Sequence, residues 1–314
     1  MENYILAKKI IDKKYKNSEY YPLLVLSLYG LLNKYNKNKD IVISIFRKTK
    51  IIIEEGPIKD IIGRHNITAI DLDDDENEET GFLGVSNQGY NFYVDENNNI
   101  LFDTVSPFII CDKRRGNNKL LNIFIHEMSH LIKGYKNNHT TIEDDKKIFY
   151  SIRSGLNYYV CEFNKQNDEL TEEIYNQALD EAINTIQTTE VMQDIKSLDG
   201  IIPDKRIQDF IDTLDKDTMN KDYGYEILVP IVRKLWKIKS FKKLIEDNVV
   251  EGNIKRINKE INELLGEDSY ENIGITLDNI YNLDGCSGYE EKLQEEIDYI
   301  NEVINNYKEK VLTK

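Results

Sequence analysis

The segment His126-Glu-Met-Ser-His130 holds the side chains of this sequence whose types and spacing could do chemistry. It contains two of the chain's four histidines, four residues apart, with Glu127 directly after the first. On an α-helix, residues four apart lie on the same face, about one turn from each other. Two imidazoles in this arrangement converge on one ion, and zinc binds neutral imidazole nitrogens at about 2.0–2.1 Å. The spacing therefore predicts a zinc site on a helix, with His126 and His130 as ligands.

Glu127 is displaced around the same helix from the two histidines, so it need not bind the metal. A carboxylate in that place can deprotonate a zinc-activated water, because zinc lowers the pKa of bound water to about 7. The protonated carboxyl can then deliver its proton to a departing amine, while the metal polarises the carbonyl that is attacked. We therefore interpret Glu127 as a general base and general acid.

The residues around this segment predict one helix over 118–133. Asn117 or Asn118 can cap its start, and Gly134 suits its end. The apolar residues fall on one broad face at 100° per residue: Leu120, Leu121, Phe124, Ile125, Met128, Leu131 and Ile132. We expect that face to meet the core, which leaves the two histidines on the other side of the helix.

An HExxH segment on such a helix resembles the active helix of the zincin metallopeptidases. The resemblance implies an α+β fold in which a small mixed sheet lies over the active helix and a mainly helical C-terminal lobe follows. Residues 1–135 would form the mixed α/β lobe that ends with the active helix. Residues 136–314 would carry the third metal ligand, and both lobes would make one integrated catalytic unit. The implied activity is zinc-dependent hydrolysis of peptide bonds, with one catalytic Zn²⁺ and a peptide or protein substrate, as in metalloendopeptidases.

A catalytic zinc needs a third protein ligand and an open fourth position. The metzincin pattern would place Gly at 133 and His at 136, but this chain has lysine at both positions. In the gluzincin branch the third ligand is a Glu on a later helix, and the segment Leu179-Asp-Glu-Ala-Ile-Asn-Thr185 is similar to that type. This resemblance assigns Glu181. The carboxylates of Glu143, Glu173 and Glu190 remain competitors.

A helix over 171–192 is expected to carry Glu181. Thr171 offers a capping hydroxyl, and two glutamates follow it at the positive end of the helix dipole. Glu181 lies on the flank of the apolar face, a position compatible with a cleft or with solvent. In the thermolysin branch an Asp stands four residues after the ligand Glu and orients a histidine, whereas this chain has Thr185 there.

The group that would stabilise an oxyanion is left open by the sequence. Such enzymes commonly use a tyrosine or a histidine for this purpose. The candidates are Tyr158, Tyr159, Tyr225 and His139, the last in an expected polar loop that could also approach the metal.

The rest of the chain divides near residue 116 into a mixed part and a helical part. Before it we expect a buried helix over 20–36, strands over 51–53 and 66–71, a short helix opened by Pro57, and a hairpin that pairs 92–94 with 100–102 across 95–99. After it we expect helices over 205–215, 224–238, 240–263 and 289–311, a kink or break at Pro230, and one strand over 148–155. The acidic run 71–79 is interpreted as a solvated loop, because an EF-hand needs Gly and a carboxylate where Glu76 and Phe82 stand.

Composition narrows the function further. The 314 residues carry a net charge of −15, which argues against binding nucleic acid through a general positive field. The longest apolar run, residues 20–32, is too short to span a bilayer, and residues 1–16 do not form a signal peptide. Three widely spaced cysteines form no CxxC pair. We therefore expect a cytoplasmic protein with no nucleic-acid or membrane partner, and its oligomeric state is left open.

Two other functions are compatible with these residues. One is a non-enzymatic zinc-binding module with a zincin-like fold and a regulatory or interaction role. The other is a metal-free helical interaction protein. Glu127 favours the enzyme, because a purely structural zinc site has no need of a carboxylate beside its ligands.

Overall fold

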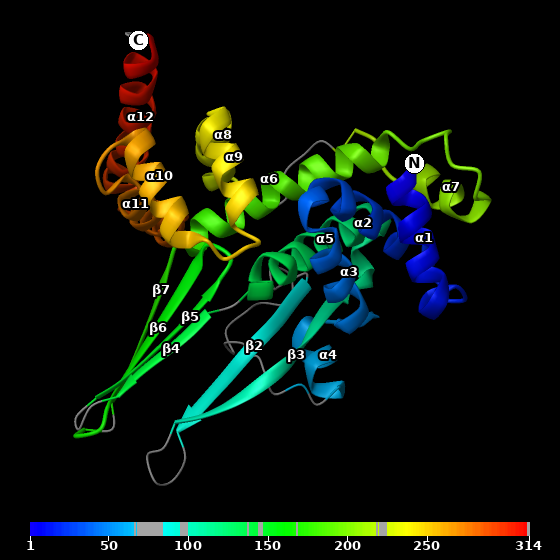
Figure 1. Cartoon of the computed structure of the whole chain (residues 1–314), viewed down its shortest axis with the longest axis horizontal. Coiled ribbons are helices and arrows are strands. Elements are labelled where there is room, and N and C mark those ends of the chain that lie inside the picture. The colour runs from blue at the N-terminus through cyan, green and yellow to red at the C-terminus, as the bar shows by residue number, and fades with distance from the viewer. Residues whose placement is uncertain are drawn as a thin grey trace. The chain divides into compact units, whose positions relative to one another are not determined.

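A computed structural model describes residues 1–65, 67, 84–94, 100–136, 138–143, 147–167, 169–217, 219 and 225–312. The chain is a helix-rich α+β protein with two small sheets (Figure 1). It divides into unit 1, Met1–Ile132 with Gln187–Lys221, and unit 2, Lys133–Ile186 with Asp222–Lys314. The acidic run 71–79, the hairpin turn 95–99 and all of the predicted strand 66–71 except Ile67 lie outside the described residues.

Unit 1 combines helices with a three-stranded sheet. Its helices are α1 (Glu2–Tyr15), α2 (Tyr21–Lys34), α3 (Lys39–Lys48), α4 (Ile58–Arg64), α5 (Asn117–Lys133) and α7 (Lys205–Asp212), and its strands are β1 (Lys50–Glu54), β2 (Gly84–Val94) and β3 (Ile100–Asp112). Two helices cross between the units along the chain: α5 ends one residue beyond unit 1, and α6 (Gln177–Lys196) starts in unit 2 and ends in unit 1.

Helix α2 is the centre of the unit 1 core. Every residue from Tyr21 to Leu32 is buried, as expected for a helix that is apolar on all sides. Gly30 allows the close approach of α6, because a Cβ atom at this position would lie 2.4 Å from Cγ1 of Val191. This contact fixes the later part of α6 against α2.

The three-stranded sheet has the order β1-β3-β2, with β1 parallel and β2 antiparallel to β3. Side chains alternate between its two faces. On one face Ile52, Phe108 and Ile110 form a buried cluster with the isoleucines of α4. Ser86 lies opposite Ile109 in the register, so both belong to the other face. This second face meets helix α5, since Ser86 donates a hydrogen bond to Glu127.

Unit 2 contains a four-stranded antiparallel meander and a group of helices. Its strands, in the order β4-β5-β6-β7, are β4 (Asn138–Glu143), β5 (Lys147–Ser154), β6 (Asn157–Asn164) and β7 (Glu169–Tyr175). Its helices after α6 are α8 (Leu228–Trp236), α9 (Lys239–Asn248), α10 (Ile254–Leu265), α11 (Ser269–Leu283) and α12 (Glu290–Leu312). Of this sheet, only the strand over 148–155 was predicted. The polar loop expected around His139 was wrong, because these residues form β4 and pair with β5.

Several predicted elements are confirmed. The helices over 20–36, 118–133, 205–215 and 289–311, the helix after Pro57, the strands over 51–53 and 148–155, and the β2–β3 hairpin all occur. Along the described residues, no helix is both long and apolar enough to cross a membrane.

The predicted helix over 171–192 was wrong at its start. Residues 169–175 form strand β7, which pairs with β6, and α6 begins only at Gln177. Thr171 therefore caps no helix. It lies opposite Glu162 in the strand register, and Glu173 lies opposite Val160. The local signals for a helix start were overridden by pairing with a neighbouring strand, which such signals do not report.

Two further helix boundaries needed correction. The stretch predicted as one helix over 240–263 is two helices, α9 and α10, which are separated by Val249–Asn253 with Gly252 in the left-handed region at φ 69°. The helix predicted over 224–238 begins at Leu228, so Pro230 lies in its first turn. A proline there removes no helical hydrogen bond, and no kink is needed.

Candidate metal centre

Helix α5 presents the HExxH residues away from its buried stripe. All seven apolar residues predicted to meet the core are buried, whereas His126, Glu127 and His130 are partly exposed. Phe124 packs edge-to-face against Phe46 of α3, with ring centroids 6.0 Å apart. The stripe therefore fixes the rotation of the helix, and this rotation leaves both imidazoles on the accessible side.

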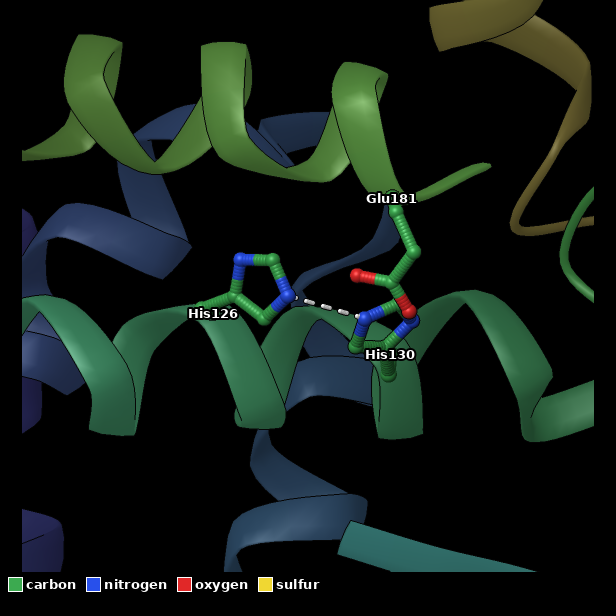
Figure 2. Close-up of side chains that lie close together, drawn as sticks. All are labelled: His126, His130 and Glu181. Carbon is green, nitrogen blue, oxygen red and sulfur yellow. Dashed lines mark hydrogen bonds between the residues drawn. The ribbon is translucent and has the colours of Figure 1, made fainter. Parts of the chain in front are cut away.

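The two imidazoles lie as a metal-binding pair would. Their Nε2 atoms are 3.1 Å apart and share a hydrogen bond, and the ring centroids are 4.8 Å apart (Figure 2). Two nitrogens bound to a tetrahedral zinc at 2.0–2.1 Å would be separated by about 3.3 Å. The observed spacing fits that value, so both side chains could bind one ion with little movement.

Glu181 completes a group of three possible ligands with His126 and His130. One ligand atom from each residue lies within 4.8 Å of the others, and all three side chains are partly buried. Figure 2 shows the Glu181 carboxylate beside the two rings. Within the described part of the chain this is the one group of three or more His, Cys, Asp or Glu that could hold a metal ion. Two imidazoles and one carboxylate form a donor set that zinc accepts.

Two of the competing carboxylates interact with other residues, and the side chain of the third is not among those that the structure describes. Glu190 forms an ion pair with Lys34 of α2. Glu173 is exposed on β7 and accepts a hydrogen bond from the hydroxyl of Tyr175. Glu143 is on β4, but its side chain is not among those described, and the same holds for His139.

The start of α6, which carries Glu181, is capped from a distant part of the chain. The carboxylate of Asp278 on α11 accepts hydrogen bonds from the backbone N–H groups of Asn176 at 2.7 Å and Ala178 at 2.8 Å. Burial raises the pKa of Asp278, and these two bonds act against the rise. Gly274 on α11 makes room for the junction, since a Cβ there would lie 1.7 Å from Oδ1 of Asn176. The first turn of the Glu181 helix is thereby held in place.

Glu127 has a hydrogen-bond partner that no sequence pattern predicted. The hydroxyl of Ser86 on β2 donates a hydrogen bond of 2.8 Å to Oε2 of Glu127. Cys111 is buried on the neighbouring strand β3. Burial raises its pKa strongly, with a smaller contribution from the negative charge of Glu127. Burial thus favours the neutral thiol, and the hydroxyl of Ser86 is the hydrogen-bond donor described for the Glu127 carboxylate. No sequence signal distinguishes Ser86 from an ordinary strand serine.

Two of the three tyrosines considered for the oxyanion role, Tyr158 and Tyr225, contact other aromatic rings. Tyr158 on β6 stacks on Tyr175 of β7, with ring centroids 6.1 Å apart. Tyr225 adopts a left-handed backbone at φ 55°, and its ring lies 5.9 Å from that of Tyr281. Thr185, one turn after Glu181, is buried.

Comparisons of this chain with protein-family models, with curated proteins and with solved structures gave no match. What the chain does is therefore inferred from its own residues, and its strongest functional feature is the possible metal-binding group of His126, His130 and Glu181.

Proposed function

We propose that this chain is a zinc-dependent metallopeptidase of the zincin type, with a ligand set like that of the gluzincins. The observation that carries the proposal is the convergence of Glu181 with the histidine pair of the HExxH helix. The helix alone could be a chance motif. A carboxylate from a second helix, 51 residues beyond His130 in the chain, supplies the third donor that a catalytic zinc requires.

Bound zinc would polarise the carbonyl of a scissile peptide bond and lower the pKa of an attacking water. Glu127 would take one proton from that water as its oxygen bonds to the carbonyl carbon. As the C–N bond breaks, Glu127 would return the proton to the leaving nitrogen, so that an amine and a carboxylic acid result. Ser86 supports this role, because its hydroxyl holds one carboxylate oxygen and leaves the other for the proton.

Metal removal tests the proposed function directly. The purified protein should contain about one zinc per chain, and it should cleave members of a peptide library. Treatment with a chelator should abolish cleavage, and added zinc should restore it. A chain that purifies without stoichiometric metal and cannot be reloaded contradicts the zinc site. A chain that binds zinc but cleaves no peptide is instead a zinc-binding module without peptidase activity.

Replacing Ser86 by alanine should lower kcat/KM about 10- to 150-fold and leave zinc binding unchanged, because a hydrogen bond to a charged group contributes about 1.5–3 kcal/mol. The loss should appear mainly in kcat, since the hydroxyl orients the base and binds no substrate. Ser129→Ala is the matched control. That hydroxyl donates to the carbonyl oxygen of Ile125 within α5, on the buried side of the helix. Equal effects of the two substitutions would contradict an orienting role for Ser86.

A further inference from the structure

A buried ion pair lies beside the candidate metal centre. One of its residues is on the helix that carries the two histidines, and the other is on the helix that carries Glu181. Nζ of Lys133, the last residue of α5, is 2.8 Å from Oδ1 of Asp180 on α6. The two side chains are 1 % and 5 % exposed. Lysine and aspartate are almost never buried to this degree unless they are paired. Such a pair generally adds little net stability compared with apolar residues, so its presence calls for another explanation.

The turn between β5 and β6 contacts both residues of this pair. The backbone N–H of Leu156 donates a second hydrogen bond to Oδ1 of Asp180, at 3.2 Å. Gly155 has φ 62°, and a Cβ there would lie 3.1 Å from the same oxygen and 3.3 Å from Cβ of Lys133. The aspartate is thus held by α5 and by the turn together. These bonds are directional and charge-assisted, so they define one relative position of the two helix ends.

The pair is adjacent in sequence to two of the proposed ligands. Lys133 comes three residues after His130 on α5, and Asp180 directly precedes Glu181 on α6. A helix is stiff over one turn, so a bond between residues 133 and 180 also sets where the neighbouring ligands stand. We propose that Lys133 and Asp180 are positioning residues that hold Glu181 in register with the histidines. This inference rests on the proposed zinc site and concerns how that site is assembled.

The test compares two lysine–carboxylate pairs that both involve α6. The variant Lys133→Met with Asp180→Asn removes both charges and leaves no unpaired one. The control, Lys34→Met with Glu190→Gln, removes the pair between α2 and α6 that lies farther along the same helix. Each protein is titrated with zinc alone against a chromophoric chelator. The absorption of the Co²⁺-loaded protein and the thermal midpoint of the metal-free protein are also recorded.

We expect the Lys133/Asp180 variant to bind zinc about 10–100-fold more weakly, the range typical of residues that support metal ligands. Its Co²⁺ spectrum should change, because Glu181 no longer reaches the ion in the same way. The control variant should keep the zinc affinity and the Co²⁺ spectrum of the wild type, even if its thermal midpoint falls as far as that of the Lys133/Asp180 variant. If the two substitutions acted only on folding stability, the thermal midpoints would change, but the zinc affinities of the two variants would not differ.

The inference is overturned if the Lys133/Asp180 variant binds zinc like the wild type, or if both variants lose affinity in proportion to their midpoints. Should the double substitution not fold, Lys133→Met alone decides by the same measurements, since it removes the bond between α5 and α6 while the N–H of Leu156 still donates to the Asp180 carboxyl group. Glu181→Gln separates this inference from the zinc site itself. Unchanged zinc binding in Glu181→Gln contradicts the ligand assignment. Weakened binding in Glu181→Gln with unchanged binding in the Lys133/Asp180 variant contradicts only the positioning role.

Discussion

Replacing Glu127 by glutamine is expected to abolish peptide cleavage while zinc binding persists. Glutamine has nearly the same shape, and its amide oxygen can still accept the hydrogen bond from Ser86 that the carboxylate accepts at 2.8 Å. It cannot take a proton from water at neutral pH, so the general base and acid are lost together. General acid–base catalysis contributes about 10²–10⁴-fold, and kcat/KM should fall by at least that factor. Zinc content and kcat/KM are measured on the same preparation.

The control for this substitution is Glu173→Gln. It makes the same chemical change at an exposed position on β7 and should alter neither zinc content nor cleavage. Two results would argue against the proposed role of Glu127. Cleavage at the wild-type rate would show that another group moves the proton. Loss of zinc together with activity would show that Glu127 helps to hold the metal.

Helix α5 could be predicted almost to the residue, at 118–133 against the observed 117–133. The information needed for it is local. An apolar stripe of helical period, polar caps and a histidine pair at one-turn spacing all lie within about twenty consecutive residues. The strong apolar character of 20–36 made α2 predictable for the same reason.

The start of the Glu181 helix could not be predicted, because its determinants are distant in sequence. Thr171 and the two glutamates after it form a good local start for a helix, yet these residues pair with β6. The capping carboxylate of α6 comes from Asp278, 100 residues beyond Ala178. The periodicity of the apolar residues could not decide whether Glu181 faces a cleft or solvent. Only the folded chain brings it beside the histidine pair, where the gluzincin resemblance had assigned it.

The residues that we propose to support the site could not be predicted, for a related reason. Ser86 and Glu127 are 41 residues apart, and Lys133 and Asp180 are 47 apart. In the sequence, Lys133 is informative only because it does not fit the metzincin pattern. A serine in a strand and a lysine at a helix end are ordinary in isolation. Their roles depend on which segments the fold brings together.

Substituting Glu181 by glutamine is expected to weaken zinc binding at least about 100-fold, more than loss of a residue that only supports a ligand. The amide keeps the size of the side chain and removes its negative charge, which leaves two neutral imidazoles to hold a divalent cation. Cleavage should fall in parallel at low zinc and recover partly when zinc is supplied in excess. The dissociation constant is measured by competition with a chelator, and the thermal midpoint of the metal-free protein shows whether the fold is kept.

Glu190→Gln is the matched control, because it makes the same change on the same helix. Glu190 was a competing ligand on the sequence alone, but in the structure it forms an ion pair with Lys34. Its substitution should lower the thermal midpoint, because the Lys34 side chain is only 9 % exposed and loses this partner, and should leave zinc affinity at the wild-type value. If Glu190→Gln weakened zinc binding more than Glu181→Gln did, the third ligand would have to be reassigned. If neither did, the carboxylate ligand would have to come from a side chain beyond those described.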